Sequence, residues 1–398
     1  REPLLELRPE YEGTGHTLEE SVSAAGAAPE LAEFASRGLL KGVPALHGHQ
    51  EAALTAGVTP GKNMVITAGT GSGKTESFML PLLSSLLEES RDWKGSSSLG
   101  GKWWDSNSPS FVSQRQSDAG RSAVRAIVLY PMNALVDDQL IRLRRALDSD
   151  EVRSWLNEHR SGHRFYFGRY TGATPVTGSR TNGLRVKELA TYLRATEARG
   201  NRARELAAQL GDEDLQYFVP RLDGAEMRSR WDMAVAPPDI LITNYSMLNV
   251  MLLRDRDTHF FESTRRWLEN PANRFTLVVD ELHTYRGTAG SEVAYLLRHL
   301  KRRLGLDEHP EQFRVLAASA SLDAQRDQEY LHQFFDAQPG SFAFIEGTNK
   351  VPSLKDPVSA EDPAGLAAMS AGDAAVVARE AGVGESLRTA MHARSGAG

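Results

Sequence analysis

The chain has 398 residues, enough for two or three domains, and its 46 basic and 52 acidic side chains give a formal net charge of −6. This charge is too small to indicate a nucleic-acid partner by itself, and the lack of cysteine excludes disulfides, iron–sulfur clusters and cysteine-ligated zinc from this sequence. No apolar run approaches the roughly 20 residues of a membrane-spanning helix, so we expect a cytoplasmic protein without a membrane partner. Because the first residue is Arg1 rather than Met, we expect a piece of a longer protein.

The sequence predicts three parts. Residues 1–45 are polar and rich in Gly and Ala, as in an N-terminal lead-in segment. From residue 63 onward, short apolar runs alternate with helical stretches; the runs are NMVIT, VRAIVLYP, RFYFGRYTG, DILITNY, RFTLVVD, QFRVLAAS and SFAFIEG. Because strands that alternate with helices need crossover connections, residues 46–347 should form an α/β domain with a mostly parallel sheet and helices on both faces. Residues 348–398 are expected to be a linker.

Two insertions interrupt this alternation, at about residues 91–123 and 178–231. The first is rich in Gly and Ser yet contains Trp93, Trp103 and Trp104, so it is either a long loop held by its aromatic side chains or a plain flexible loop. The second contains the charged helical stretch RVKELATYLRATEARGNRARELAAQL. A solvated helix is the default interpretation of such a stretch, and contact with nucleic acid is the alternative.

The segment VITAGTGSGKTESF, residues 65–78, contains a phosphate-binding pattern, in which an apolar strand is expected to lead into a Gly-rich turn and then a helix. Glycines allow backbone N–H groups to wrap around a phosphate, and the helix N-terminus favours negative charge. Lys74 can reach the terminal phosphates, and the Thr75 hydroxyl can bind Mg²⁺. The pattern predicts a P-loop, although Ala68 stands where the strict pattern has Gly. The alternative is a Gly-rich turn without a ligand.

Two carboxylates, Asp280 and Glu281, directly follow the apolar run from Leu277 to Val279, which indicates a strand buried on both faces. An unpaired carboxylate at the rim of a core is costly, so a cation should lie opposite. Ligands bind at the carboxyl ends of parallel strands. As in P-loop ATPases, we assign Asp280 to hold Mg²⁺ and Glu281 to polarise the water that attacks the γ-phosphorus of the nucleotide. The alternative is a helix N-cap with a favourable acid in the first turn.

These motifs resemble those of the superfamily 2 helicases and translocases, whose DExH box is similar to Asp280-Glu281-Leu282-His283. Further segments resemble the other motifs of the first motor domain in the family's order: LHGHQEAAL the Q motif, LYPMNALVDDQ motif Ia, RYTGATP the TG element, ITNYSML the motif before the DExH box, and Ser319-Ala320-Ser321 motif III. The resemblance implies a RecA-like P-loop domain with ATP and Mg²⁺ as cofactors and Gln50 on the adenine edge. The implied nucleotide contacts are Gln50, Gly69, Thr70, Gly71, Ser72, Gly73, Lys74, Thr75 and Glu76.

Within the superfamily, YPMNALVDDQ, TNYSMLNVMLLR and DELHTYRGTAGSEVA look closest to the group that contains mitomycin-repair helicases and the large helicases of bacterial antiphage systems of the Druantia and DISARM kinds. This implies ATP-driven movement on single-stranded DNA in antiphage defence or DNA repair, with subunits of such systems as further partners. The implied nucleic-acid contacts are Pro131, Asn133, Ala134, Thr171, Gly172, Thr243 and Asn244. Short polar groups and backbone N–H donors at strand ends suit phosphate oxygens, so binding should be salt-sensitive and blind to sequence. Thr243 and Asn244 could instead cap the next helix.

The resemblance also implies what lies around the nucleotide. His283 should couple the nucleotide site to Ser319 and Ser321. Superfamily 2 motors bind ATP between two RecA-like domains, and no QxxGRxxR-like segment follows Ser321, so we expect a second domain elsewhere in the longer chain and slow hydrolysis by this part alone. A nucleotide-gated DNA- or protein-binding module without unwinding activity is the alternative function. A P-loop kinase or ABC-type ATPase is disfavoured because no LSGGQ-like signature occurs.

Overall fold

The structure is a computed structural model that describes residues 10–350 except residues 70, 71, 94, 96, 98, 132, 320, 325 and 348. The chain divides into two units, Gly13–Gly347 and a second one made of Arg1–Glu12 with Thr348–Gly398. The described part of the second unit is an antiparallel pair of two-residue strands, β1 (Glu10–Tyr11) and β9 (Asn349–Lys350). Within the described ranges, no helix is long and apolar enough to cross a membrane.

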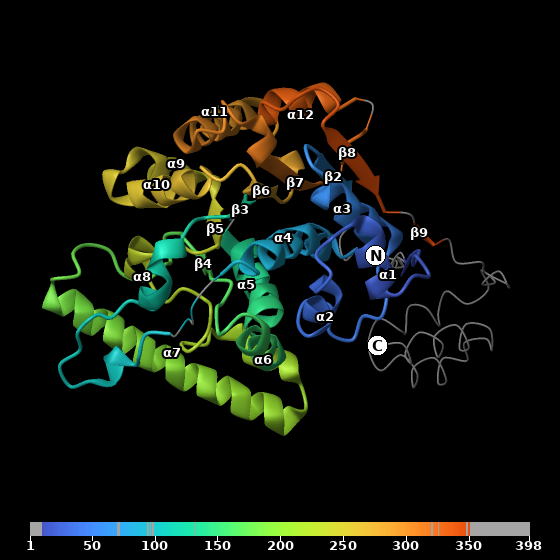
Figure 1. Ribbon diagram of the computed structural model, residues 1–398. Coiled ribbons are helices and arrows are strands. Elements are labelled where there is room, and N and C mark those ends of the chain that lie inside the picture. The colour runs from blue at the N-terminus through green and yellow to red at the C-terminus, as the bar shows by residue number, and fades with distance from the viewer. Residues whose placement is uncertain are drawn as a thin grey trace, which may run out of the picture. The chain divides into compact units, whose positions relative to one another are not determined.

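The centre of the Gly13–Gly347 unit is a seven-stranded sheet in the order β4-β5-β3-β6-β7-β2-β8, and every neighbouring pair is parallel (Figure 1). The strands are β2 (Asn63–Thr67), β3 (Ala126–Tyr130), β4 (Phe167–Arg169), β5 (Ile240–Asn244), β6 (Phe275–Val279), β7 (Phe313–Ser319) and β8 (Phe342–Glu346). These strands lie in the apolar runs found in the sequence, because a strand covered on both faces has no polar alternation. The predicted α/β class with a parallel sheet is confirmed.

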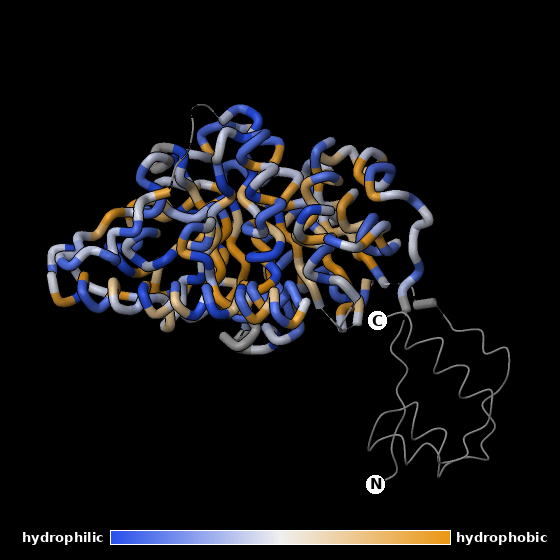
Figure 2. The backbone as a smooth tube through the Cα atoms, turned by 90° about the horizontal axis from the view of Figure 1, so that it is seen from below, coloured by the Kyte–Doolittle hydropathy of each residue, from blue (hydrophilic) through white to orange (hydrophobic). Residues whose placement is uncertain are grey.

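Helices cover both faces of the sheet. Successive strand residues point to opposite faces, and since the strands are apolar at nearly every position, both faces carry apolar side chains that must be buried. The helices are α1 (Leu18–Ala25), α2 (Leu31–Ser36), α3 (Gly48–Val58), α4 (Lys74–Ser90), α5 (Asn133–Asp148), α6 (Asp150–His159), α7 (Gly183–Leu210), α8 (Arg230–Val235), α9 (Tyr245–Leu253), α10 (Thr258–Trp267), α11 (Gly287–Leu304) and α12 (Gln328–Phe335). On β3, Val128 faces a core shared with α1 to α6, whereas Ile127 and Leu129 face a core shared with α9 to α12. In Figure 2 the apolar stretches accordingly gather along the central strands.

The predicted lead-in segment contributes to the main core. Leu18 and Val22 of α1 and Phe34 of α2 are buried in the same apolar cluster as the helices that follow the P-loop. Helix α1 begins where Thr17 and Glu20 form a capping box, which satisfies two backbone N–H groups at its start. The predicted boundary at residue 45 therefore separates residues that pack in one core. The division into a lead-in segment and a RecA-like domain at this residue stays a prediction.

The two insertions pack against each other. Trp103 and Trp104 of the first are buried against one side of α7 in the second, together with Trp231, in a small separate core. The Trp104 indole N–H donates to Glu197 of α7 at 3.1 Å, and Arg194 of α7 donates to the Trp104 carbonyl at 2.7 Å. The first insertion is thus held by its aromatic side chains rather than being a plain flexible loop.

Helix α7 is stabilised by caps at both of its ends and by ion pairs along its surface. Asn182 accepts hydrogen bonds from the first backbone N–H groups, and Gly211 ends the helix with a φ of 67°. Arg185 pairs with Glu188 at 2.8 Å, and a second Arg–Glu pair lies further along the same helix. These short-range pairs fit the solvated-helix interpretation of this stretch.

Candidate active site

The P-loop sequence lies between the end of β2 and the start of α4, as predicted. Gly73 has a φ of 78°, a conformation that residues with a side chain rarely adopt, and a Cβ atom there would lie 2.3 Å from the Gln50 amide nitrogen and displace it. Ser72 is buried and Gly69 precedes the turn, whereas Thr70 and Gly71 lie outside the described residues. The N-terminus of α4 begins at Lys74, so the first backbone N–H groups of this helix face the loop.

Lys74 and Glu281 meet at the carboxyl edge of the sheet. The Lys74 ammonium lies 3.7 Å from a Glu281 carboxylate oxygen, and both side chains are largely buried. The Lys74 Nζ atom has no hydrogen-bond partner among the described residues. Glu281 adopts a left-handed backbone conformation with a φ of 50°, which is unusual for a residue other than glycine and is typical of strained functional positions.

Asp280 lies at the same edge, directly after β6. One of its carboxylate oxygens accepts the backbone N–H of Glu281 at 2.9 Å. Burial raises the pKa of Asp280, and the Glu281 carboxylate raises it further, whereas the positive charges of Lys74 and Arg142 lower it. Additional positive charge beside Asp280 would therefore favour its ionised form.

Motif III lies between these two halves of the site. Strand β7 runs between β6 and β2, and Ser319 at its end is paired in register with Thr67, the last residue of β2. Ser319 is buried and its hydroxyl accepts the backbone N–H of Ser321 at 3.4 Å. The sheet order thus places Ser319 beside the strand that leads into the P-loop.

His283 contacts Glu281 rather than the serines. Its Nδ1 atom lies 3.3 Å from Glu281, and the described contacts include no hydrogen bond from His283 to Ser319 or Ser321. Arg286 instead donates to the Ser321 carbonyl at 3.5 Å. The coupling role of His283 stays a prediction. Arg286, three residues after the DExH box, contacts Ser321 of motif III instead.

Gln50 and His49 hold the P-loop from α3. The Gln50 side chain is buried; its oxygen accepts the His47 backbone N–H at 2.9 Å, and its amide donates to the Gly73 carbonyl at 3.4 Å. His49 Nε2 donates to the Ser72 carbonyl at 2.7 Å, and burial lowers the pKa of His49, which favours the neutral ring. The adenine contact of Gln50 stays a prediction, and the role of His49 was missed because a single histidine carries no pattern of its own.

Helix α5 is joined to the first turn of α4 by two side chains one turn apart. Gln139 donates to the Thr75 hydroxyl at 3.3 Å, and Arg142 contacts Glu76 at 3.1 Å. Sequence reasoning missed both residues, although their three-residue spacing places them on one helix face. The contacts link the predicted Mg²⁺ ligand Thr75 to the helix whose first turn contains motif Ia.

The predicted nucleic-acid residues gather on three neighbouring strand ends, those of β4, β5 and β3. Asn244 pairs in register with Tyr130, so it lies beside the half-buried Pro131. Gly172 follows β4 and is exposed. Asn133 and Ala134 form the first turn of α5, and their side chains lie outside the described residues.

Three of these residues are engaged within the protein. The Thr243 side chain is buried and donates to the Tyr170 carbonyl at 2.8 Å. The Asn244 side chain caps α9 by accepting the Met247 N–H at 2.8 Å. Thr171 is buried, and Arg230 from the second insertion donates to its carbonyl at 2.5 Å. Their side chains therefore shape the strand ends from within the protein.

Comparisons with known proteins relate the chain to helicases. The sequence profile of the DEAD/DEAH box helicase family matches residues 47–165. Over 329 residues the chain is 34% identical to the Druantia protein DruE of Escherichia coli (strain UMEA 4076-1), which covers 72% of this chain and 17% of that protein. The chain therefore spans about a sixth of the length of this curated relative.

Two solved structures show lower similarity. The DUF1998 helicase MrfA bound to DNA is 20% identical with a TM-score of 0.47, over 85% of this chain and 31% of that chain. Mss116p bound to ssRNA and AMP-PNP is 14% identical with a TM-score of 0.48, over 86% of this chain and 47% of that chain.

Proposed function

Because the chain contains a DEAD/DEAH box helicase domain homologous to part of Druantia protein DruE, we propose that it is the first RecA-like motor domain of an ATP-dependent DNA helicase or translocase. The motor couples ATP hydrolysis to movement on single-stranded DNA in antiphage defence or DNA repair. A second RecA-like domain of the same longer protein completes its ATP site. The observation that carries this proposal is the meeting of Lys74 and Glu281 at 3.7 Å on the carboxyl edge of a parallel sheet.

The ionic character of the site fits a nucleoside triphosphate with Mg²⁺. The buried Lys74 ammonium has no hydrogen-bond partner among the described residues, so an anionic ligand such as a phosphate would satisfy it. Thr75 and Asp280 are oxygen donors of the type that Mg²⁺ prefers, and they neighbour Lys74 and Glu281 in sequence. Bound Mg²⁺ supplies positive charge that neutralises the phosphates and the paired acids.

Glu281 is the proposed general base. Its strained backbone directs the carboxylate toward Lys74, where it can accept a proton from the water that attacks the terminal phosphate. The Nδ1 atom of His283 lies 3.3 Å from a Glu281 carboxylate oxygen, beside the proposed base. Lys74 keeps the triphosphate within reach, and the glycines of the P-loop let backbone N–H groups surround it.

The DNA-binding role is proposed for the strand ends of β3, β4 and β5. Their backbone donors suit a phosphate chain, so binding should weaken steeply as salt increases. Gln139 and Arg142 connect this side of the sheet to Thr75 and Glu76, so DNA bound near the start of α5 can alter the nucleotide site.

The test is phosphate release by the complete protein with and without single-stranded DNA. We expect DNA to stimulate release and Lys74→Ala to abolish nucleotide binding, while Lys62→Ala, an exposed lysine near β2, leaves both unchanged. Glu281→Gln should retain ATP binding and lower turnover by roughly 10²- to 10⁴-fold. Equal turnover in Glu281→Gln and the parent protein would remove Glu281 from the mechanism. Tight DNA binding without stimulation would contradict the motor and favour the nucleotide-gated binding module.

A further inference from the structure

A cavity of about 980 Å³ lies at the edge of the sheet opposite to the proposed ATP site. The residues that line it include Arg125, Thr276 and Arg314, which stand at the amino ends of β3, β6 and β7. Because the strands are parallel, their amino ends lie at the edge away from Lys74 and Glu281. The last turns of α4 form another wall, and the volume is in the range of sites for small organic ligands.

Arg314 is a buried charge in this cavity without an acidic partner. It is 3% exposed, and its guanidinium donates to the Thr276 hydroxyl at 2.8 Å, the Gly57 carbonyl at 2.8 Å and the Ser85 hydroxyl at 3.1 Å. All three acceptors are neutral, and no described carboxylate forms an ion pair with Arg314. Gly57 lies in the last turn of α3, whose dipole offsets part of the charge. A buried guanidinium with neutral partners alone still has a large desolvation cost.

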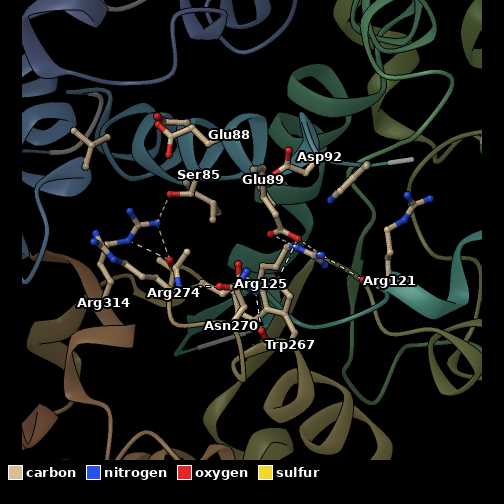
Figure 3. A pocket seen from close by; sticks show the side chains of 18 of the residues that line it. Ser85, Glu88, Glu89, Asp92, Arg121, Arg125, Trp267, Asn270, Arg274 and Arg314 are labelled. Atoms are coloured by element: carbon tan, nitrogen blue, oxygen red, sulfur yellow. Dashed lines mark hydrogen bonds and ion pairs between the residues drawn. The ribbon is translucent and has the colours of Figure 1, made fainter. Parts of the chain in front are cut away.

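A second arginine lies next to Arg314. Burial, and to a lesser extent the positive charge of Arg274, lower the pKa of Arg314 to about 10. Arg274 is half-buried and forms no hydrogen bond or ion pair with the residues that the structure describes. Figure 3 shows both guanidinium groups at one end of the cavity, close to Ser85. Two like charges held together without an acid between them are typical of a site for an anion.

The acids of the cavity do not cancel this charge. Glu89 is already engaged, because it accepts hydrogen bonds from Arg125 and, at 3.2 Å, from the Trp267 indole. Glu88 and Asp92 are both exposed, and of these two only Glu88 raises the pKa of Arg314, as a minor contribution. Arg266, also exposed on the lining, adds a further positive charge.

We propose that this cavity binds a phosphate-bearing small molecule through Arg314 and Arg274. The planar guanidinium fork of Arg274 matches the oxygens of a phosphate, and Arg314, whose N–H groups largely donate to Thr276, Gly57 and Ser85, adds positive charge beside it. The cavity is larger than a phosphate alone, so its remaining volume, lined in part by Trp267, can hold an organic group. The ligand is either free inorganic phosphate or a phosphomonoester of nucleotide size.

The test uses the Lys74→Ala background, in which the P-loop no longer binds phosphates, and measures binding of inorganic phosphate and AMP by calorimetry. We expect saturable binding of at least one of them. Arg274→Gln should weaken it by roughly tenfold, the effect of one charge-assisted hydrogen bond, whereas Glu88→Gln should tighten it. The matched control is Arg302→Gln on α11, whose side chain is 83% exposed and outside the cavity.

Binding of phosphate without AMP would identify the free ion as the ligand, and tighter binding of AMP would identify the phosphomonoester. The proposal is overturned if neither binds at millimolar concentration, or if Arg274→Gln and Arg302→Gln behave alike. Arg314→Gln is not used, because loss of its three internal contacts would disturb α3 and β6. A negative result leaves hydrolysis at the P-loop untouched, so this inference and the proposed motor function fail independently.

Discussion

Asp148, the last residue of α5, carries a buried carboxylate, and we expect Asp148→Asn to stabilise the protein above neutral pH. Neither carboxylate oxygen forms a hydrogen bond of normal geometry with the described residues. Arg153 and Arg221 lie near enough to lower the pKa of Asp148, but both pair with Asp223 at 3.2 Å instead. The backbone N–H of Ala225 also lowers the pKa, but no described basic side chain forms an ion pair with Asp148, so its charge is buried without a charged partner.

The size of the effect follows from the pKa. Burial raises the pKa of Asp148 from 3.8 to about 7. Between these pH values the native state retains a proton that the unfolded chain has lost, so the free energy of unfolding falls as the pH rises through this range. The full shift corresponds to about 4 kcal/mol, and relaxation around the buried charge should make the measured value smaller. Asparagine resembles the protonated acid in shape and carries no charge at any pH.

The measurement is urea-induced unfolding of both proteins across a series of pH values. Below pH 3.8, where Asp148 is protonated in both the native and the unfolded state, the two should have similar stability; above pH 7 the variant should be more stable by roughly 2–4 kcal/mol. Asp214→Asn is the control, since that side chain is 62% exposed and should change little. A difference that stays constant with pH, or a variant that is less stable at alkaline pH, would refute the assignment of an unpaired buried carboxylate.

Two further predictions concern contacts found in the fold. Gln139→Ala removes the hydrogen bond to Thr75, so the KM for Mg²⁺–ATP should rise by roughly two- to tenfold in steady-state assays, with less change in kcat. An unchanged KM, or an equal rise in the control Gln209→Ala, an exposed glutamine on α7, would exclude a positioning role. Trp104→Ala removes a buried side chain from the small core between the two insertions. The free energy of unfolding in urea should fall by roughly 3–5 kcal/mol, and proteolysis at residues 91–123 should become faster. Unchanged proteolysis would show that this contact does not hold the loop.

The placement of both halves of the proposed site at strand ends was predictable because each half is encoded by neighbouring residues. The Gly-rich turn before Lys74 and the acids after Val279 each stand at the end of an apolar run, so the local sequence places both at strand ends. The parallel sheet was predictable for a related reason, since strands that alternate with helices require crossover connections. None of these inferences needs knowledge of which strands are neighbours.

The contacts between distant segments were not predictable. Gln139 reaches Thr75, and Trp104 packs on α7, but neither a glutamine nor a tryptophan specifies its partner in sequence. Arg314 and Arg274 are separated by 40 positions and become neighbours because β6 and β7 pair in register. Thr243 and Asn244 were predicted as nucleic-acid contacts or helix caps. The positions of β5 and α9 in the fold bring their side chains into hydrogen bonds with Tyr170 and Met247.

By itself, the sequence determined the class of the fold and the two halves of the nucleotide site, because turn geometry, helix starts and strand ends depend on residues a few positions apart. The tertiary structure alone decided that Lys74 and Glu281 meet at 3.7 Å, that Ser319 lies beside the strand before the P-loop, and that two arginines share a cavity at the other edge. These arrangements depend on the order of strands in the sheet, which is set by the packing of apolar surfaces from all parts of the domain at once.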